Sequence, residues 1–303
     1  METIKDKNLN PVMVCPACGS TDWKLSGQTK DYSITGEWFE LNECVQCHLK
    51  ATHPQPDAKD LGRYYSSKEY ISHSDTNSGI TNKLFHRARN FMMKKKYHWV
   101  SKAADKTSGN LLDIGAGTGY FAKYMHDHGW NVTALEPDET ARKVAAEKLK
   151  IQLLSLDELP DLIQGSYDVI TLWHVLEHVH DVTGYMNHFR SLLKPNGIIV
   201  IAVPNYTSRD AEQYGPQWAA YDVPRHLWHF SPASIEKLLV RHGFKLFQKI
   251  TMPLDAFYVS MLSEKYRGNY FLGPLAAFIS GLRTLFSEKK NVNRASSIIY
   301  VAR

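Results

Sequence analysis

Three glycines at alternate positions are the first feature of this sequence that points to chemistry. Gly115, Gly117 and Gly119 follow a short apolar run that ends in Asp113, and small and aromatic residues at helical spacing come next. The pattern predicts a strand, a tight turn and a helix start. Glycine lets backbone N–H groups approach a ligand and adopts positive φ without strain, and a helix N-terminus favours negative charge. A nucleotide-like ligand is therefore expected at this turn.

The spacing of the glycines limits which nucleotide fits. The dinucleotide fingerprint would place its third glycine at position 120, where this chain has Tyr120. A carboxylate, Glu136, closes the next predicted strand. The glycine turn after Asp113, together with Glu136, resembles motifs I and II of the class I S-adenosylmethionine-dependent methyltransferases. A glycine turn in another kind of α/β protein is the alternative.

The resemblance implies how the cofactor is held. Asp113 would face the cationic methionine end, directly or through water. Backbone groups around Gly115 and Gly117 would meet the methionine moiety, and Glu136 would accept hydrogen bonds from both ribose hydroxyls. The helix that begins at Gly119 completes this cradle.

The remaining cofactor contacts are expected at the ends of the third and fourth predicted strands. Ser155 and Leu156 would flank the adenine, although the acidic residue that many family members carry there is offset to Asp157 in this chain. Trp173 ends the fourth strand. Because ligands of doubly wound sheets bind at the carboxyl ends of the strands, Trp173 is expected beside the cofactor.

Two histidines follow that fourth strand. The segment from Trp173 to Val179, with His174, Glu177 and His178, resembles the histidine-rich motif of the methyltransferase subfamily whose members often modify small-molecule hydroxyls, including those of quinone precursors. Histidine can accept a hydroxyl proton near neutral pH. His174 and His178 are therefore candidate catalytic bases, and buried structural histidines are the alternative.

A loop after the fifth predicted strand holds more ionisable and aromatic groups than a connection needs. Its Arg225-His226-Leu segment resembles a segment at the same place in that subfamily. Arg225 could hold an anionic group of the acceptor, with Trp218 and Tyr221 as further substrate contacts. Asp222 or His226 could serve as base. The alternative is an Asp222–Arg225 ion pair that only fixes the loop.

The four cysteines form two C-x-x-C pairs, Cys15 with Cys18 and Cys44 with Cys47. Two such pairs at this separation predict a tetrahedral Cys₄ zinc site. The residues between them alternate like short strands, and the module resembles a zinc ribbon or a rubredoxin-like knuckle. It is too small to hold a core alone, so the metal would be structural. Iron or a redox dithiol is the alternative.

The composition is that of a soluble globular protein. A chain of 303 residues with 43% hydrophobic and 22% charged residues has room for a large domain and a small one. The net charge of +5 permits an anionic partner without requiring one. Residues 1–10 have no apolar stretch typical of a secretory signal. A cytoplasmic location is the default expectation.

The elements that must position these groups alternate between strands and helices. From residue 105 to 303 the pattern predicts an α/β domain with a doubly wound, seven-stranded, mostly parallel sheet, since buried parallel strands read as continuous apolar runs. The third strand is expected at 151–155. The family resemblance implies that the last two strands are antiparallel, with the final one inserted between the fifth and the sixth.

Three further regions complete the predicted organisation. Residues 1–56 are predicted to form the zinc-ribbon module, and residues 57–104 a linker with an amphipathic helix near its end. The Lys94–Lys96 run of this helix is interpreted as a solvated face, and contact with an anionic substrate or lipid headgroup is the alternative. Residues 253–295 are a helical insertion before the last strand. A packed helical hairpin is one interpretation of the insertion. A cap over the substrate or a peripheral membrane contact through 254–286 is the other.

These features together predict an S-adenosylmethionine-dependent methyltransferase with a structural zinc ion, acting on a hydroxyl of a small molecule, which could be linked to a saccharide or a lipid. An RNA-modifying methyltransferase is the first alternative, but the chain has no long basic stripe with interleaved aromatic residues, which makes a nucleic-acid partner unexpected. A non-catalytic cofactor-binding protein is the second. The identity of the acceptor and the oligomeric state do not follow from the sequence.

Overall fold

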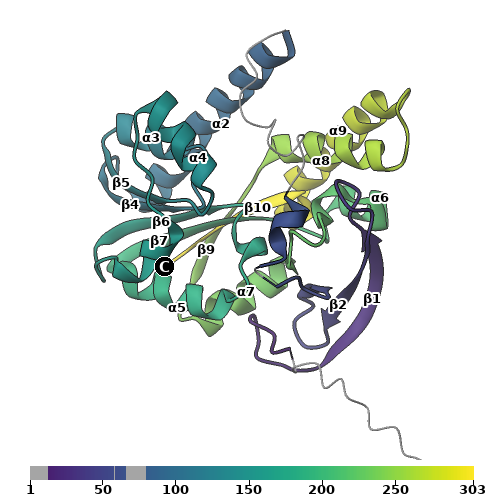
Figure 1. The fold of residues 1–303 in the computed structure, drawn as a ribbon, viewed down its shortest axis with the longest axis horizontal. Coiled ribbons are helices and arrows are strands. Elements are labelled where there is room, and N and C mark those ends of the chain that lie inside the picture. Colours follow the sequence, from purple (N-terminus) through teal and green to yellow (C-terminus); the bar gives the residue numbers. More distant parts are fainter. Residues whose placement is uncertain (1–12, 58, 66–79) are drawn as a thin grey trace, which may run out of the picture.

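The computed structural model describes residues 13–57, 59–65 and 80–303. A large sheet with helices on both faces lies beside a small sheet built mainly by the N-terminal segment (Figure 1). The α/β architecture expected from the alternation of strands and helices is confirmed.

The large sheet has the strand order β5-β4-β6-β7-β10-β9. Its strands are β4 (Gly109–Ile114), β5 (Trp130–Leu135), β6 (Tyr167–Trp173), β7 (Leu193–Pro204), β9 (Leu246–Thr251) and β10 (Ser297–Ala302). The first four pair in parallel, and β10 pairs antiparallel with both β7 and β9. The final strand therefore lies between the two that precede it, as the family resemblance implied.

The third strand, expected at 151–155, is present only as one parallel bridge between Leu154 and Leu135. The extended stretch is cut short at both ends. Lys150 has the left-handed φ of 55° at the end of the preceding π-helical turn, and Ser155 already begins a capping box. The sheet thus has six full strands and a seventh reduced to one bridge.

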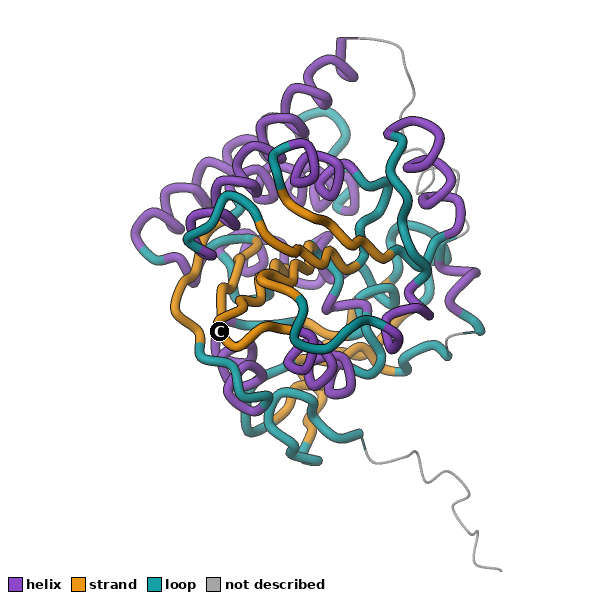
Figure 2. Tube along the Cα trace, turned by 90° about the vertical axis from the view of Figure 1, so that its left-hand side faces the viewer, coloured by secondary structure: helices purple, strands orange, loops and turns teal. Residues whose placement is uncertain are grey.

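The two faces of the large sheet carry separate apolar clusters, because successive side chains of a strand point to opposite faces. On β4, Leu112 and Ile114 belong to the cluster that includes helices α5 and α7, whereas Leu111 belongs to the cluster that includes α2 and α3. Figure 2 shows the strands running between helices on both sides. The helices of these two clusters are α2 (Ile80–Ala104), α3 (Tyr120–Asp127), α5 (Val182–Leu192) and α7 (Pro232–Arg241). Two shorter helices belong to neither cluster: α4 (Glu139–Val144), and α6 (Arg209–Tyr214), whose buried apolar residues join a third cluster with Phe39 and Leu41.

The small sheet has the order β1-β2-β3-β8, and all its pairs are antiparallel. Its strands are β1 (Trp23–Lys30), β2 (Trp38–Cys44), β3 (Lys50–His53) and β8 (Trp228–His229). Strand β8 directly follows the loop with the predicted substrate residues and pairs with β3, so this loop is connected to the small sheet. The cysteine-containing segments also share one apolar cluster with α5 and α7.

The insertion before the last strand forms a helical hairpin. Its helices are α8 (Pro253–Tyr266) and α9 (Gly273–Lys290). The two pack closely at Gly281, where a Cβ atom would lie 2.4 Å from Cδ1 of Phe257. Within the described part of the chain, none of the helices combines the length and the apolar character needed to cross a membrane.

Candidate active site and cysteine cluster

The glycine turn lies between β4 and α3, and each of its three glycines has a positive φ, between 56° and 80°. A Cβ atom at Gly115 would lie 2.5 Å from Cγ2 of Val175, and one at Gly119 would lie 3.2 Å from Cβ of Ala145. A Cβ atom at Gly117 would meet nothing within 4 Å. Packing therefore accounts for two of the glycines, whereas Gly117 faces open space that a ligand could enter.

Two carboxylates flank this turn. Asp113, at the end of β4, is 1% exposed and accepts a hydrogen bond of 2.7 Å from Oγ1 of Thr171. Burial raises the pKa of Asp113 to about 7. Glu136, directly after β5, accepts from the backbone N–H groups of Gly117 at 2.7 Å and Asp138 at 3.0 Å. Its carboxylate is thus held at the open side of the turn.

Lys96 is a site residue that the sequence interpretation missed, since its basic run was expected to be a solvated helix face. Its Nζ lies 4.2 Å from the ring centroid of Trp173. Burial lowers the pKa of Lys96 to about 8, although the charges of Asp113 and Asp255 oppose this change. Lys96 precedes the buried Val100 by one helical turn, and that spacing was the available signal.

Ser155 and Leu156 lie at the start of a short 3₁₀ helix, next to the bridge with β5. The Ser155 hydroxyl donates to Asp157 at 3.0 Å, and its backbone N–H donates to Glu158 at 2.8 Å. The side chain of Ser155 is therefore engaged in capping this helix. Leu156 is partly buried against the apolar cluster of α5 and α7.

His174 follows β6 with the left-handed φ of 58° and lies between two carboxylates. Its Nε2 is 3.0 Å from Oδ2 of Asp255, and its Nδ1 is 3.3 Å from Oε1 of Glu177. Burial alone would lower the pKa of His174, but the hydrogen bonds to Asp255 and Glu177 outweigh it and raise that pKa to about 10. His174 is a cation held in place, which disfavours it as a proton acceptor near neutral pH.

His178 and His226 form a pair of neighbouring imidazoles close to Glu177. Their rings meet edge to face with centroids 4.6 Å apart. Nδ1 of His178 donates to the carbonyl oxygen of Arg225, and Nδ1 of His226 donates to that of Ala220, each over 2.9 Å. Since a carbonyl can only accept, Nε2 of each ring carries the free lone pair. Burial and the neighbouring His226 lower the pKa of His178 to about 4.

The same two histidines and Glu177 could also hold a cation. One ligand atom of each residue lies within 4.8 Å of the others. Glu177 is fully buried, and its Oε2 has no hydrogen-bond partner among the described residues. This group of side chains can therefore either move a proton or ligate a metal.

Arg225 is 1% exposed, and its guanidinium makes four hydrogen bonds. Nε and Nη2 donate to both carboxylate oxygens of Asp222, at 3.0 and 2.7 Å. Nη2 also donates to Asp31 at 2.9 Å, and Nη1 donates to the carbonyl of Tyr64 at 2.9 Å. These contacts fit the alternative interpretation, in which the Asp222–Arg225 pair fixes the loop.

Trp218 and Tyr221 are also turned into the interior. Trp218 is 2% exposed and donates from Nε1 to Oδ2 of Asp210 at 2.8 Å. Tyr221 packs edge to face against both Trp218 and His229. The structure thus brings His174, His178 and His226 together, while the expected substrate contacts at 218, 221 and 225 support the loop that carries His226.

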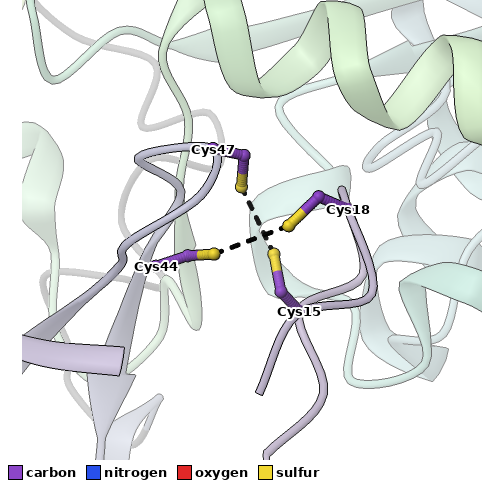
Figure 3. A group of neighbouring side chains, drawn as sticks. All are labelled: Cys15, Cys18, Cys44 and Cys47. Atoms are coloured by element: carbon purple, nitrogen blue, oxygen red, sulfur yellow. Dashed lines mark hydrogen bonds between the residues drawn. The ribbon is translucent and has the colours of Figure 1, made fainter. Parts of the chain in front are cut away.

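The four cysteines converge from two loops, as Figure 3 shows. Sγ of Cys15 lies 3.4 Å from that of Cys47, and Sγ of Cys18 lies 3.5 Å from that of Cys44. Zinc–sulfur bonds of about 2.3 Å in a tetrahedron place sulfur atoms roughly 3.8 Å apart, and a disulfide would place them about 2.05 Å apart. All four are free thiols. The cluster is consistent with a zinc ribbon.

Comparison with known proteins adds the following. Residues 84–249 match the family described as a methyltransferase domain. A ubiquinone biosynthesis O-methyltransferase from Rickettsia typhi is 32% identical over 190 residues, which cover 56% of this chain and 74% of that protein. One from Rhodopseudomonas palustris is 29% identical over 164 residues, 50% of this chain and 63% of that protein. The latter match thus spans less than two thirds of that relative.

Solved structures share the fold at low sequence identity. A magnesium protoporphyrin IX methyltransferase from Synechocystis, solved with bound SAH, has a TM-score of 0.50 and 14% identity, with 80% of this chain and 98% of that chain covered. A putative sarcosine dimethylglycine methyltransferase from Galdieria sulphuraria has a TM-score of 0.50 and 16% identity, with 72% and 87% covered.

Proposed function

The chain belongs to the methyltransferase-domain family and is a class I S-adenosylmethionine-dependent methyltransferase, and from that premise we propose that it methylates a hydroxyl group of a small molecule. The adjacent imidazoles of His178 and His226 carry this proposal. A hydroxyl becomes a good nucleophile when a positioned base removes its proton. Both rings offer an Nε2 lone pair, and both lie in the segments that follow β6 and β7.

The residues around the glycine turn fit the cofactor. Glu136 would accept hydrogen bonds from the ribose hydroxyls, and Asp113 would face the methionine ammonium. The open space at Gly117 would admit the methionine moiety, with Ser155, Leu156 and Trp173 along the rest of the cofactor. When bound, adenosylmethionine supplies an electrophilic methyl group on its sulfonium.

The protein's own part in the reaction is alignment and proton removal. His178 or His226 would take the hydroxyl proton at Nε2, while each Nδ1–H stays fixed to a backbone carbonyl. His174 and Asp222 would act as positioning residues, because each is held charged by a buried partner. The hydrogen bond with Arg225 keeps the pKa of Asp222 low despite its burial. In-line methyl transfer requires little beyond this positioning.

We further propose that the cysteine cluster holds zinc and that the zinc is structural. The sulfur distances suit tetrahedral thiolate ligation. The cluster belongs to the small sheet, whose strand β8 continues from the loop with His226. Zinc would therefore stabilise that loop without touching the reacting atoms.

An assay with isotopically labelled methyl donor tests the proposed function. Zinc-loaded protein is incubated with metabolite extracts and with panels of phenols, sugars and quinone precursors, and the product linkage is read by NMR. We expect a methoxy product, which is lost on Glu136→Ala substitution because the cofactor no longer binds. Transfer to nitrogen, carbon or RNA would contradict the hydroxyl assignment. The control Glu139→Ala, at an exposed position of α4, should remain active.

A further inference from the structure

The hairpin of α8 and α9 exposes an unusual number of large apolar side chains. At its turn, Tyr270, Phe271 and Leu272 are 73%, 100% and 67% exposed. With the exception of one adjacent pair, the exposed apolar residues of α9 lie three, four, seven, eight or eleven positions from one another, which is the spacing of one helix face. They are Leu275, Phe278, Ile279 and Phe286. Such spacing places them on one stripe of the helix, which is continuous in sequence with the turn.

The charges of the hairpin are sorted by sign. Its three acidic residues point away from solvent: Asp255 binds His174, and Glu264 and Glu288 are buried. Its basic residues are all exposed. They are Lys265, Arg267, Arg283, Lys289 and Lys290. The outer surface of the hairpin is therefore apolar and cationic, which is the combination that binds anionic lipid surfaces.

A second copy of the chain fits this surface less well, because pairing two such hairpins would bring like charges together. A bilayer with anionic headgroups matches both features at once. The exposed turn could enter the boundary between headgroups and acyl chains, while the lysines of the last turn of α9 contact the headgroups.

The hairpin also reaches the candidate active site. Asp255, in the first turn of α8, is the carboxylate that holds Nε2 of His174. The 14 residues of α8 extend about 21 Å from there toward the exposed turn. Helix α8 thus connects the end of β6, where the acceptor is expected, with the exposed turn at Tyr270, Phe271 and Leu272, which we call the tip.

We propose that the 253–290 hairpin docks the protein on anionic membranes, and, resting on the proposed function, that the acceptor hydroxyl belongs to a molecule presented from that surface. Docking of this kind is peripheral. It requires no spanning helix and buries only the tip and the outer stripe of α9.

Vesicle flotation with the full, zinc-loaded chain tests the proposal. We expect flotation with vesicles that contain phosphatidylglycerol and not with vesicles of phosphatidylcholine alone. The double substitution Phe271→Asp/Leu272→Asp should abolish it, and Lys289→Glu/Lys290→Glu should weaken it by at least about tenfold. Equal binding to both vesicle types, or unchanged flotation of the tip variant, would overturn docking on anionic lipid.

Two controls distinguish lipid docking by the hairpin from misfolding and from a general effect of added surface charge. Ile163→Asp, at a 77% exposed apolar position elsewhere, should float normally. The tip variant should bind adenosylhomocysteine as the unmodified protein does, which shows that it folds. A dimer in sedimentation that the tip variant dissociates, without lipid binding, would make the stripe a subunit interface. Because flotation needs no turnover, failure of methyl transfer with intact flotation would count against the proposed function alone.

Discussion

Arg225 donates from Nη2 to Oδ1 of Asp31 at 2.9 Å, across 194 residues of sequence, and neither side chain is more than 1% exposed. Asp31 lies in the turn between β1 and β2, and its carboxylate also accepts from the backbone N–H groups of Ser33, Ile34 and Thr35. The pair therefore joins the small N-terminal sheet to the loop that carries His226. The stability of the small sheet should thus depend on this loop, and that of the loop on the small sheet.

Replacement of Arg225 by methionine should destabilise the protein strongly. Removing one partner of a buried ion pair leaves an uncompensated charge, at a cost of about 3 to 5 kcal/mol, and here both Asp31 and Asp222 would lose their partner. Urea unfolding monitored by fluorescence measures the change. Arg63→Met, which removes an exposed guanidinium paired with Glu37, is the matched control and should change the free energy of unfolding far less. Equal effects of the two substitutions would refute the coupling.

Removal of the metal should unfold the small sheet and reduce methyl transfer. Cys44 and Cys47 lie at the end of β2 and just beyond it, so the loss of zinc frees the strands that pair with β8. Structural zinc commonly contributes about 10 kcal/mol or more to folding of such modules. Elemental analysis should find stoichiometric zinc, which is absent in Cys44→Ser. A chelator should lower the melting temperature of the wild type and leave that of the variant unchanged.

The frame of the active site was predictable because local signals specify it. The apolar run and the glycines predicted β4, the turn and the start of α3. The proline and glycine signals predicted α7 at Pro232–Arg241. These features depend on residues close together in sequence. The third strand was overestimated because the left-handed Lys150 and the cap at Ser155 leave room for only one bridge.

The contacts that decide chemical roles were not predictable in this way. Asp255 comes from an insertion with no recognisable motif, yet it makes His174 a cation. Pairing of β8 with β3 joins segments far apart in sequence. No local pattern marks such partners, and so the sequence did not reveal that the guanidinium of Arg225 is buried and bonded to Asp31.

The cationic state of His174 should appear as a pH-dependent stability. Its pKa of about 10 in the folded protein lies above the ordinary 6.5. The stabilisation is therefore complete below about pH 6.5 and is lost as pH rises through about 10. Urea midpoints should fall over this range. His174→Asn should flatten the fall because it removes the titrating imidazole, and asparagine is chosen because it tolerates the left-handed backbone at this position. His126→Asn, at an exposed position, should leave the profile unchanged.

Methyl transfer should identify which imidazole acts as base. Asparagine at 178 keeps a donor near the position of Nδ1 for the Arg225 carbonyl and removes Nε2, and asparagine at 226 does the same for Ala220. Loss of the base should lower kcat by about 10²- to 10⁴-fold with little change in cofactor affinity. Of His178→Asn and His226→Asn, the one that leaves the base in place should lower kcat less.

The pH profile of kcat/KM gives an independent test of the same residue. Burial and the neighbouring His226 hold the pKa of His178 at about 4, so this imidazole is predominantly unprotonated above about pH 5. If His178 is the base, kcat/KM rises through about pH 4 and is flat from about pH 5 to pH 7, because the reactive form is already fully populated. A rise at higher pH that persists in His178→Asn would instead assign proton removal to another group, and the imidazole of His226 lies next to that of His178.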